Sequence, residues 1–249
     1  MKSQTLTTLL LLVSFAGCNN AGTDSSVPKP ATTMVFCGVL IDGVKAAPLT
    51  NQTVTIVDER ISAITSGAPA NDDFLDLSEH TCLPGLVDTH THLIEPAADT
   101  ADLSIYYTRS LDDEQMIAQE LAARTLGAGF TTVRNLGAYN GWAGRMLRDR
   151  INSGEIPGPR MQVAGFYLTI PGGGGDLVIP EFDEEEIPAR VRMGVSRGPE
   201  QFRQKAQEAV DGGADVLKVI ASGAVLAFGG VPGSPEMTPE EIAAAAEVA

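Results

Sequence analysis

The sequence predicts an α/β protein in which a parallel sheet follows a small domain of β strands. From residue 34 to residue 81, short alternating apolar runs are separated by tight polar turns, which is typical of β strands. After Pro84, apolar runs of strand length alternate with amphipathic stretches of helical length, which indicates βαβ units and therefore a parallel sheet. The chain of 249 residues, 43% hydrophobic and 20% charged, has the composition of a globular protein.

The first eighteen residues differ from the rest of the chain. Lys2 gives a positive start, an apolar run follows over residues 6–13, and the small pair Ala16 and Gly17 precedes Cys18. Because a membrane helix needs about 20 apolar residues, we interpret residues 1–18 as a signal peptide. The segment resembles a bacterial lipobox with Phe15 in place of the usual Leu, so we expect lipidation at Cys18 and a flexible tether over residues 19–33. An ordinary secretory leader with an accidental Cys18 is the alternative.

These features predict an exported lipoprotein, anchored in the outer membrane and facing the periplasm. With 32 acidic against 17 basic side chains and a net charge of −15, the chain offers no basic stripe. We therefore expect no nucleic-acid partner, and membrane contact only through the lipid anchor. In an oxidising compartment Cys37 and Cys82, which lie in strand-like segments of one small domain, could form a disulfide. The alternative is that they are two small buried hydrophobic side chains.

The small β domain is expected over residues 34–83, with strands at 34–42, 53–57 and 61–64. The second domain is expected over residues 84–249. Its predicted strands lie at 85–89, 130–136, 161–168 and 215–221, and its predicted helices at 113–126, 142–151 and 200–210.

Two of the expected helices carry local signals. In the first, Met116, Ile117, Glu120 and Leu121 are predicted to share one face, with the apolar members packing inward. A last helix begins at Thr238-Pro239-Glu240-Glu241, which offers an N-cap hydroxyl, a proline at the first helical position and a capping-box carboxylate.

The most informative segment runs from Pro84 to His92 and reads Pro-Gly-Leu-Val-Asp-Thr-His-Thr-His. On a strand, Asp88, His90 and His92 project to one face, because side chains alternate. Two imidazoles two residues apart can bind one divalent ion and leave positions open for water. Two histidines in a solvated turn or a satisfied core are the alternative.

Lys218 is the second candidate, because it interrupts the apolar run of the strand expected at 215–221. Lysine is almost never fully buried unless it is paired. The strand could end there, with the ammonium reaching water or a carboxylate. Alternatively, the buried amine reacts with carbon dioxide to give a carbamate held by metal ions.

These two segments, at residues 84–92 and 214–223, resemble the first-strand and fourth-strand motifs of the amidohydrolase superfamily, in its imidazolonepropionase-like and Xaa-Pro dipeptidase-like branch. Residues 131–137 resemble the second-strand segment, with Asn135 where members often carry an acid. The resemblance implies a (β/α)₈ barrel, of which about four βα units are present, preceded by a small β-sandwich domain. It also implies that His90 and His92 bind one metal ion and that Lys218, as its carbamate, bridges to a second. Two zinc ions are expected, although iron, nickel, copper or manganese would also suit such ligands.

The resemblance further implies a histidine on the fifth strand, another on the sixth and an aspartate on the eighth. His80 lies upstream of the first barrel strand and cannot replace them. A barrel of this kind takes about 250 residues. We therefore expect a truncated, inactive N-terminal fragment that is unstable or aggregates on its own.

Three further segments are candidates without a firm role. The glycine run in residues 171–176 follows the third strand and either shapes a substrate pocket or is a flexible connection. Tyr106, Tyr107 and Arg109 either touch substrate or simply pack or face water. The acidic run over residues 181–186 is interpreted as solvated surface.

The sequence thus predicts a metal-dependent hydrolase of C–N bonds in amides, cyclic amides or dipeptides, with a small molecule or dipeptide as its substrate. The expected residues are His90 and His92 as metal ligands and Lys218 as ligand and catalytic group. The alternative is a non-catalytic exported lipoprotein that keeps the barrel scaffold for binding.

Overall fold

The computed structural model describes residues 31–249 except 227 and 229. The predicted signal peptide, the lipidation site Cys18 and most of the predicted tether lie outside the described residues. The chain divides into two compact units between Leu83 and Pro84, and each is described by itself. No helix among the described residues is long and apolar enough to cross a membrane.

The described part of the first unit is one four-stranded sheet. Its strands are β1 (Thr32–Leu40), β2 (Leu49–Val57), β3 (Arg60–Ser66) and β4 (Leu75–Cys82), in the order β3-β2-β1-β4. The strand β2 runs antiparallel to both β1 and β3, so the chain reverses over residues 41–48 and again over residues 58–59, whereas β4 runs parallel to β1. β1 begins two residues before the predicted domain start. Since no second sheet occurs in residues 31–83, the sandwich is not confirmed and stays a prediction.

A disulfide bond joins Cys37 of β1 to Cys82 at the end of β4. Their Cα atoms lie 5.9 Å apart, within the range that a disulfide spans. Cys37 is completely buried and packs with Leu40 and Val54 in the core of this unit. The structure thus contains the pairing rather than two separate buried thiols.

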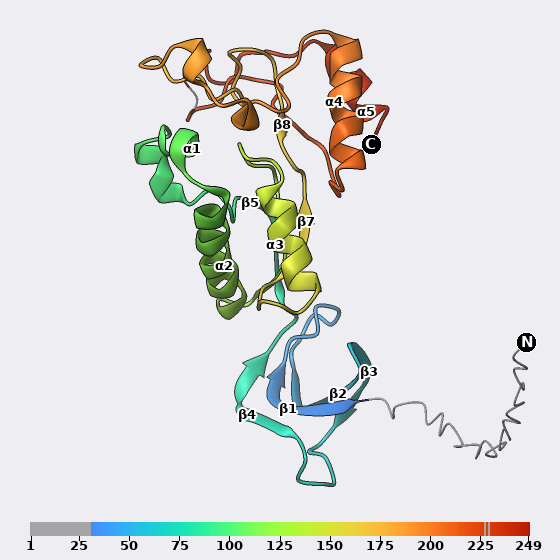
Figure 1. Cartoon of the computed structure of the whole chain (residues 1–249). Coiled ribbons are helices and arrows are strands. Elements are labelled where there is room, and N and C mark those ends of the chain that lie inside the picture. The colour runs from blue at the N-terminus through green and yellow to red at the C-terminus, as the bar shows by residue number, and fades with distance from the viewer. Residues whose placement is uncertain (1–30, 227, 229) are drawn as a thin grey trace, which may run out of the picture. The chain divides into compact units, whose positions relative to one another are not determined.

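The second unit is built on parallel strands, as the alternation of strand and helix patterns predicts. The strands β5 (Leu86–Thr91), β6 (Phe130–Asn135) and β7 (Arg160–Val163) form one parallel sheet in chain order. The helices α2 (Leu111–Gly127) and α3 (Ala143–Asn152) connect them and pack on the sheet through one buried core (Figure 1). The barrel is not closed within residues 84–249.

The expected third strand is broken into two pieces, because Gly165 takes a φ of +71° that side chains rarely adopt. After this break β8 (Tyr167–Leu168) pairs in parallel with β9 (Lys218–Val219). The fourth strand is shorter than predicted, although the amide of Ile220 still donates to the Leu168 carbonyl at 2.8 Å. The amide of Asp215 donates to the Val163 carbonyl at 2.7 Å. The segment 215–220 therefore lies alongside both pieces of the third strand.

The remaining elements are short or lie toward the end of the chain. They are the helices α1 (Ile105–Thr108), α4 (Pro199–Asp211) and α5 (Pro239–Ala246), with 3-10 turns at Ala97–Ala101, Glu184–Glu186 and Ala189–Val191. The helix α5 begins as predicted, with the Thr238 hydroxyl accepting from the Glu241 amide and the Glu241 carboxylate accepting from the Thr238 amide. The helices α4 and α5 contact each other and share a core with β8.

The predicted inner face of α2 is wrong at Met116, which is 65% exposed. The buried face instead carries Glu114, Gln115, Ala118 and Ala122. The two polar side chains are buried because each has a partner: Glu114 accepts from the Asn140 amide at 2.8 Å, and the Gln115 amide donates to a backbone carbonyl at 2.9 Å. Small alanines let the helix approach the sheet, and Leu121 packs at the edge of the contact.

Candidate active site

The two predicted histidines lie at the carboxyl end of β5. His90 is exposed at the end of the strand, Thr91 is buried, and His92, which follows the strand directly, is partly buried. The His90 and His92 rings lie 5.4 Å apart between centroids. Asp88 accepts a hydrogen bond from the His90 amide at 3.0 Å, which stiffens this turn of chain.

The surroundings of His92 fix which ring nitrogen carries the proton. The Nδ1 atom lies 3.3 Å from the Gly137 carbonyl oxygen and 3.3 Å from the Tyr167 hydroxyl oxygen. The carbonyl can only accept, and the Tyr167 hydroxyl donates to Glu95 at 2.8 Å, so both neighbours favour the tautomer in which Nδ1 donates. Burial lowers the pKa of His92, and the nearby His90 and Lys218 charges act in the same direction. A neutral ring with its Nε2 lone pair available is the form that binds a metal ion.

Glu95 closes this network from the segment after β5. Its carboxylate accepts hydrogen bonds from the Tyr139 amide and the Tyr167 hydroxyl. Burial raises the pKa of Glu95 to about 7, against the opposing effect of these two donors. Sequence reasoning missed Glu95, Tyr139 and Tyr167. The signal in the sequence is the apolar pair Leu93 and Ile94 directly before Glu95, and the structure buries both side chains.

Lys218 lies on β9 directly beside Tyr167 of β8, since the two residues are paired in the parallel register. It is partly buried, and within the described residues it makes no hydrogen bond or ion pair. Lys218 and His92 line the same pocket, which has a volume of about 470 Å³. The structure therefore brings the imidazole of the first barrel strand and the amine of the fourth to one cavity, whereas His90 lies beside it.

Aromatic and apolar side chains form most of the remaining pocket wall. The Tyr139 ring lies between those of Tyr106 and Tyr167, tilted by 49° at 5.3 Å from the first and edge-on at 5.4 Å from the second. The other lining residues are Glu95, Pro96, Ala97, Thr100, Leu103, Gly174, Gly175, Ile220, Ala224 and Leu226.

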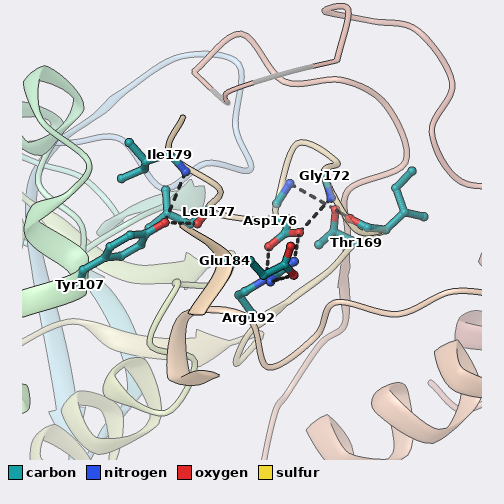
Figure 2. Close-up of polar contacts among 10 residues, drawn as sticks. Tyr107, Thr169, Gly172, Asp176, Leu177, Ile179, Glu184 and Arg192 are labelled. Carbon is teal, nitrogen blue, oxygen red and sulfur yellow. Dashed lines mark hydrogen bonds and ion pairs between the residues drawn. The ribbon is translucent and has the colours of Figure 1, made fainter. Parts of the chain in front are cut away.

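The glycine loop, residues 171–176, is part of the pocket wall rather than a loose connection. Gly174 and Gly175 line the cavity, and the Asp176 side chain is fully buried against Arg192 (Figure 2). Of the two alternatives for this run, the structure supports the one in which it shapes a pocket. The adjoining acidic run is partly structural, because Glu184 is exposed but also pairs with Arg192 at 2.7 Å.

The structure gives different surroundings to the three candidates that follow β5. Tyr106 is buried, lines the pocket and donates its hydroxyl to Asp99 at 2.9 Å. Arg109 forms a two-point ion pair with the same carboxylate, at 2.5 and 2.9 Å, and does not line the pocket. Tyr107 is buried, with its hydroxyl on the Leu177 carbonyl at 2.6 Å. Only Tyr106 is therefore placed to touch a ligand.

Asn135 stands where the resemblance leads one to expect an acid. It is 1% exposed, and its side-chain oxygen accepts from the Leu93 amide at 2.8 Å. It therefore holds the chain after β5 against the end of β6 and supplies no ligand to the pocket.

The described residues fit one side of a metal site and do not complete it. Across residues 31–249, leaving out 227 and 229, no group of three or more His, Cys, Asp or Glu side chains is placed to hold an ion. The donors that do fit are the available Nε2 of His92, the neighbouring His90 ring and the unpaired amine of Lys218.

A protein-family profile and several known proteins match this chain. The profile described as the amidohydrolase family matches residues 81–249. The ochratoxinase of Aspergillus niger is 27% identical over 245 residues, covering 88% of this chain and 48% of that protein. An imidazolonepropionase from Arthrobacter sp. (strain FB24) is 48% identical over 56 residues, or 22% of this chain and 14% of that one.

The solved structure of a Xaa-Pro dipeptidase with methionine bound in its active site superposes with a TM-score of 0.75 and 29% identity. It covers 88% of this chain, which in turn covers 54% of the dipeptidase. The chain thus spans about half the length of the ochratoxinase and dipeptidase that it matches.

Proposed function

We propose, since the chain belongs to the amidohydrolase family, that it acts in the metal-dependent hydrolysis of C–N bonds in amides, cyclic amides or dipeptides. The observation that carries the proposal is the pocket shared by His92, which directly follows β5, and Lys218 on β9. Relatives whose names state a hydrolytic activity, ochratoxinase and Xaa-Pro dipeptidase, support the same reaction class.

Members of this family generally use divalent metal ions. In our proposal His90 and His92 bind one ion through their ring nitrogens, and zinc is the expected metal. Carbamylation joins the Nζ atom of neutral Lys218 to the carbon of carbon dioxide and releases a proton, so that the amine becomes an anionic ligand. The chemistry that such ions supply is the acidification of a water molecule and the polarisation of the scissile carbonyl.

The chain's own residues prepare the pocket for this chemistry. Tyr167 and the Gly137 carbonyl hold His92 in the tautomer that leaves Nε2 available. The tyrosine cluster and the glycine loop provide a mostly apolar wall that excludes water and orients a small substrate. We propose that a complete site needs further ligands besides those that the described residues supply.

A second candidate, a non-catalytic exported lipoprotein that uses the scaffold for binding, is favoured by the lack of a third ligand among the described residues. Export, lipidation at Cys18 and outer-membrane anchoring are part of both proposals. Substituting Cys18 with Ala and following membrane association of the protein tests the anchor.

Metal content distinguishes the two candidates. We expect the purified protein to hold about one or more equivalents of divalent metal, and His92→Ala to lose metal affinity by more than about 100-fold. His80→Ala is the matched control, because this exposed histidine lies on β4 in the first unit. The readouts are elemental analysis and hydrolysis of Xaa-Pro dipeptides and N-acyl amino acids. Metal binding that is equal in His92→Ala and His80→Ala would remove the hydrolase proposal.

A further inference from the structure

The amides of the glycine loop are all satisfied from within the protein. Each of the four consecutive glycines donates one hydrogen bond to a nearby oxygen. The acceptors are the Asp176 carboxylate at 2.8 Å for Gly172, the Ile170 carbonyl at 2.9 Å for Gly173, the Glu236 carboxylate at 2.8 Å for Gly174 and the Thr169 hydroxyl at 3.2 Å for Gly175. None of these donors is left for an anionic ligand, so the loop is not an anion-binding nest. The loop instead forms an ordered part of the pocket wall.

The loop is glycine-rich because it is pressed against the chain that follows Lys218. A Cβ atom at Gly174 would lie 2.8 Å from the Cβ atom of Ala224, and one at Gly175 would lie 2.9 Å from the side chain of Ile220. Both distances are shorter than real Cβ contacts. The loop therefore needs glycine for close packing, and its position is coupled to the segment that carries Lys218.

A buried ion pair anchors the end of the loop. The Asp176 side chain has no exposed surface and accepts from the Nε and Nη2 atoms of Arg192, each at 2.7 Å (Figure 2). The same carboxylate accepts from the Gly172 amide, so one side chain closes the loop and ties it to Arg192. Such a two-point pair fixes direction as well as distance.

The segment between Asp176 and Arg192 also contacts the part of the chain that carries Tyr106 and Tyr107. The Tyr107 hydroxyl donates to the Leu177 carbonyl at 2.6 Å and accepts from the Ile179 amide at 3.4 Å (Figure 2). Arg190 donates to the carbonyls of Tyr106 and Tyr107 at 3.0 and 2.8 Å. The helix α1, which carries Tyr106 into the pocket, is thus attached to the same segment.

We propose that Asp176 is a positioning residue, which with Arg192 fixes the glycine loop as an immobile pocket wall. Through the adjoining contacts to Tyr107, the same segment sets the spacing between this wall and Tyr106. The inference rests on the proposed hydrolase function for its catalytic consequence. The consequence is that the pair controls how substrate fits, while the chemistry at His92 and Lys218 is left unchanged.

Amide hydrogen exchange in the whole protein tests the structural part without requiring activity. We expect Asp176→Asn to raise the exchange rates of the Gly172, Gly174 and Gly175 amides at least tenfold, with rates in α3 unchanged. Glu155→Gln, which breaks the surface pair between Arg150 and Glu155, is the control and should leave the loop unchanged. Unchanged loop exchange in Asp176→Asn would overturn the proposal.

A second variant covers the case in which Asp176→Asn does not fold. Tyr107→Phe removes one hydroxyl and should raise exchange at the Ile179 amide and in the glycine loop. Exchange that rises at Ile179 alone would show that the two contacts are not coupled, and would overturn the proposed spacing role.

The catalytic part is tested by the split between KM and kcat. If dipeptides are hydrolysed, we expect Asp176→Asn to raise KM about tenfold with kcat within about twofold, while Asp176→Glu recovers part of the loss. A fall in kcat at unchanged KM would contradict a positioning role in substrate fit. If no hydrolysis occurs in the parent protein, the exchange result still decides the role of Asp176, and only the hydrolase proposal fails.

Discussion

In the glycine loop, the amides and the Asp176 carboxylate are satisfied by partners within the chain. By contrast His92 and Lys218, on the same pocket, each keep a nitrogen that forms no hydrogen bond with a described residue. Polar groups that maintain a fold bind one another, because an unpaired buried group is costly. Among the described residues, the amine of Lys218 and the Nε2 atom of His92 have no such partner. The difference separates the part of the pocket that is built for shape from the part that is available for chemistry.

The largest effect on stability should come from the loop side. Asp176→Asn removes the charge of the fully buried partner of Arg192, which is 19% exposed and keeps Glu184, so we expect a loss of about 3 kcal/mol in the free energy of unfolding. Glu155→Gln should cost no more than about 1 kcal/mol, since Arg150 and Glu155 are 28% and 58% exposed. Urea unfolding of the two variants measures the contrast, and equal losses would erase the distinction between the two pairs.

Glu95 links the two sides of the comparison, because it is partly buried and accepts a hydrogen bond from Tyr167, which contacts His92. Its pKa rises from 4.5 to about 7 on folding, so the carboxyl group is neutral in the folded state over a range where it is charged in the unfolded state. Folding therefore binds a proton between pH 4.5 and pH 7, and stability is lost as the pH rises through this interval. The penalty is fully present above pH 7 and absent below pH 4.5.

Glu95→Gln removes that penalty. We expect the metal-free variant to be more stable than the parent by up to about 3 kcal/mol at pH 8 and equally stable near pH 4.5. Urea unfolding across this pH range measures the difference. A difference that does not change with pH would show that burial does not raise the pKa of Glu95.

The smallest effect should be at the hydroxyl of Tyr167. Tyr167→Phe removes one of the two acceptors at His92 Nδ1 and leaves the Gly137 carbonyl, so we expect a smaller population of the Nδ1–H tautomer. Zinc affinity should fall about tenfold. Nitrogen NMR of the His92 ring and zinc titration measure the two effects. Tyr106→Phe is the matched control, because its hydroxyl donates to Asp99 instead; an equal effect there would exclude a specific role for Tyr167.

The sequence predicts the parts of the structure that depend on local patterns. The order of strands and helices in the second unit and the capping box at Thr238 follow from short-range spacing, and the structure confirms them. The placement of His92 and Lys218 at one pocket also follows, because parallel strands present their carboxyl ends at the same edge. In the structure His92 and Lys218 reach this pocket although β5 and β9 belong to two separate parallel sheets.

The parts that depend on distant partners could not be predicted. The glycine loop is a wall only because Glu236, 62 residues away, and Arg192 meet it. Tyr167 reaches His92 across 75 residues and after a break at Gly165. The inner face of α2 was missed because Glu114 and Gln115 are buried through partners that periodicity does not reveal.

The link between Cys37 and Cys82 has a consequence for how the first unit responds to proteases. It encloses the strands β2 and β3 in a covalent ring across a sequence separation of 45 residues. A single backbone cut anywhere in that ring opens a loop but separates no fragment, so a nicked molecule stays one covalent unit until the disulfide is reduced. The second unit has no such ring among its described residues, and a single cut there divides the chain at once.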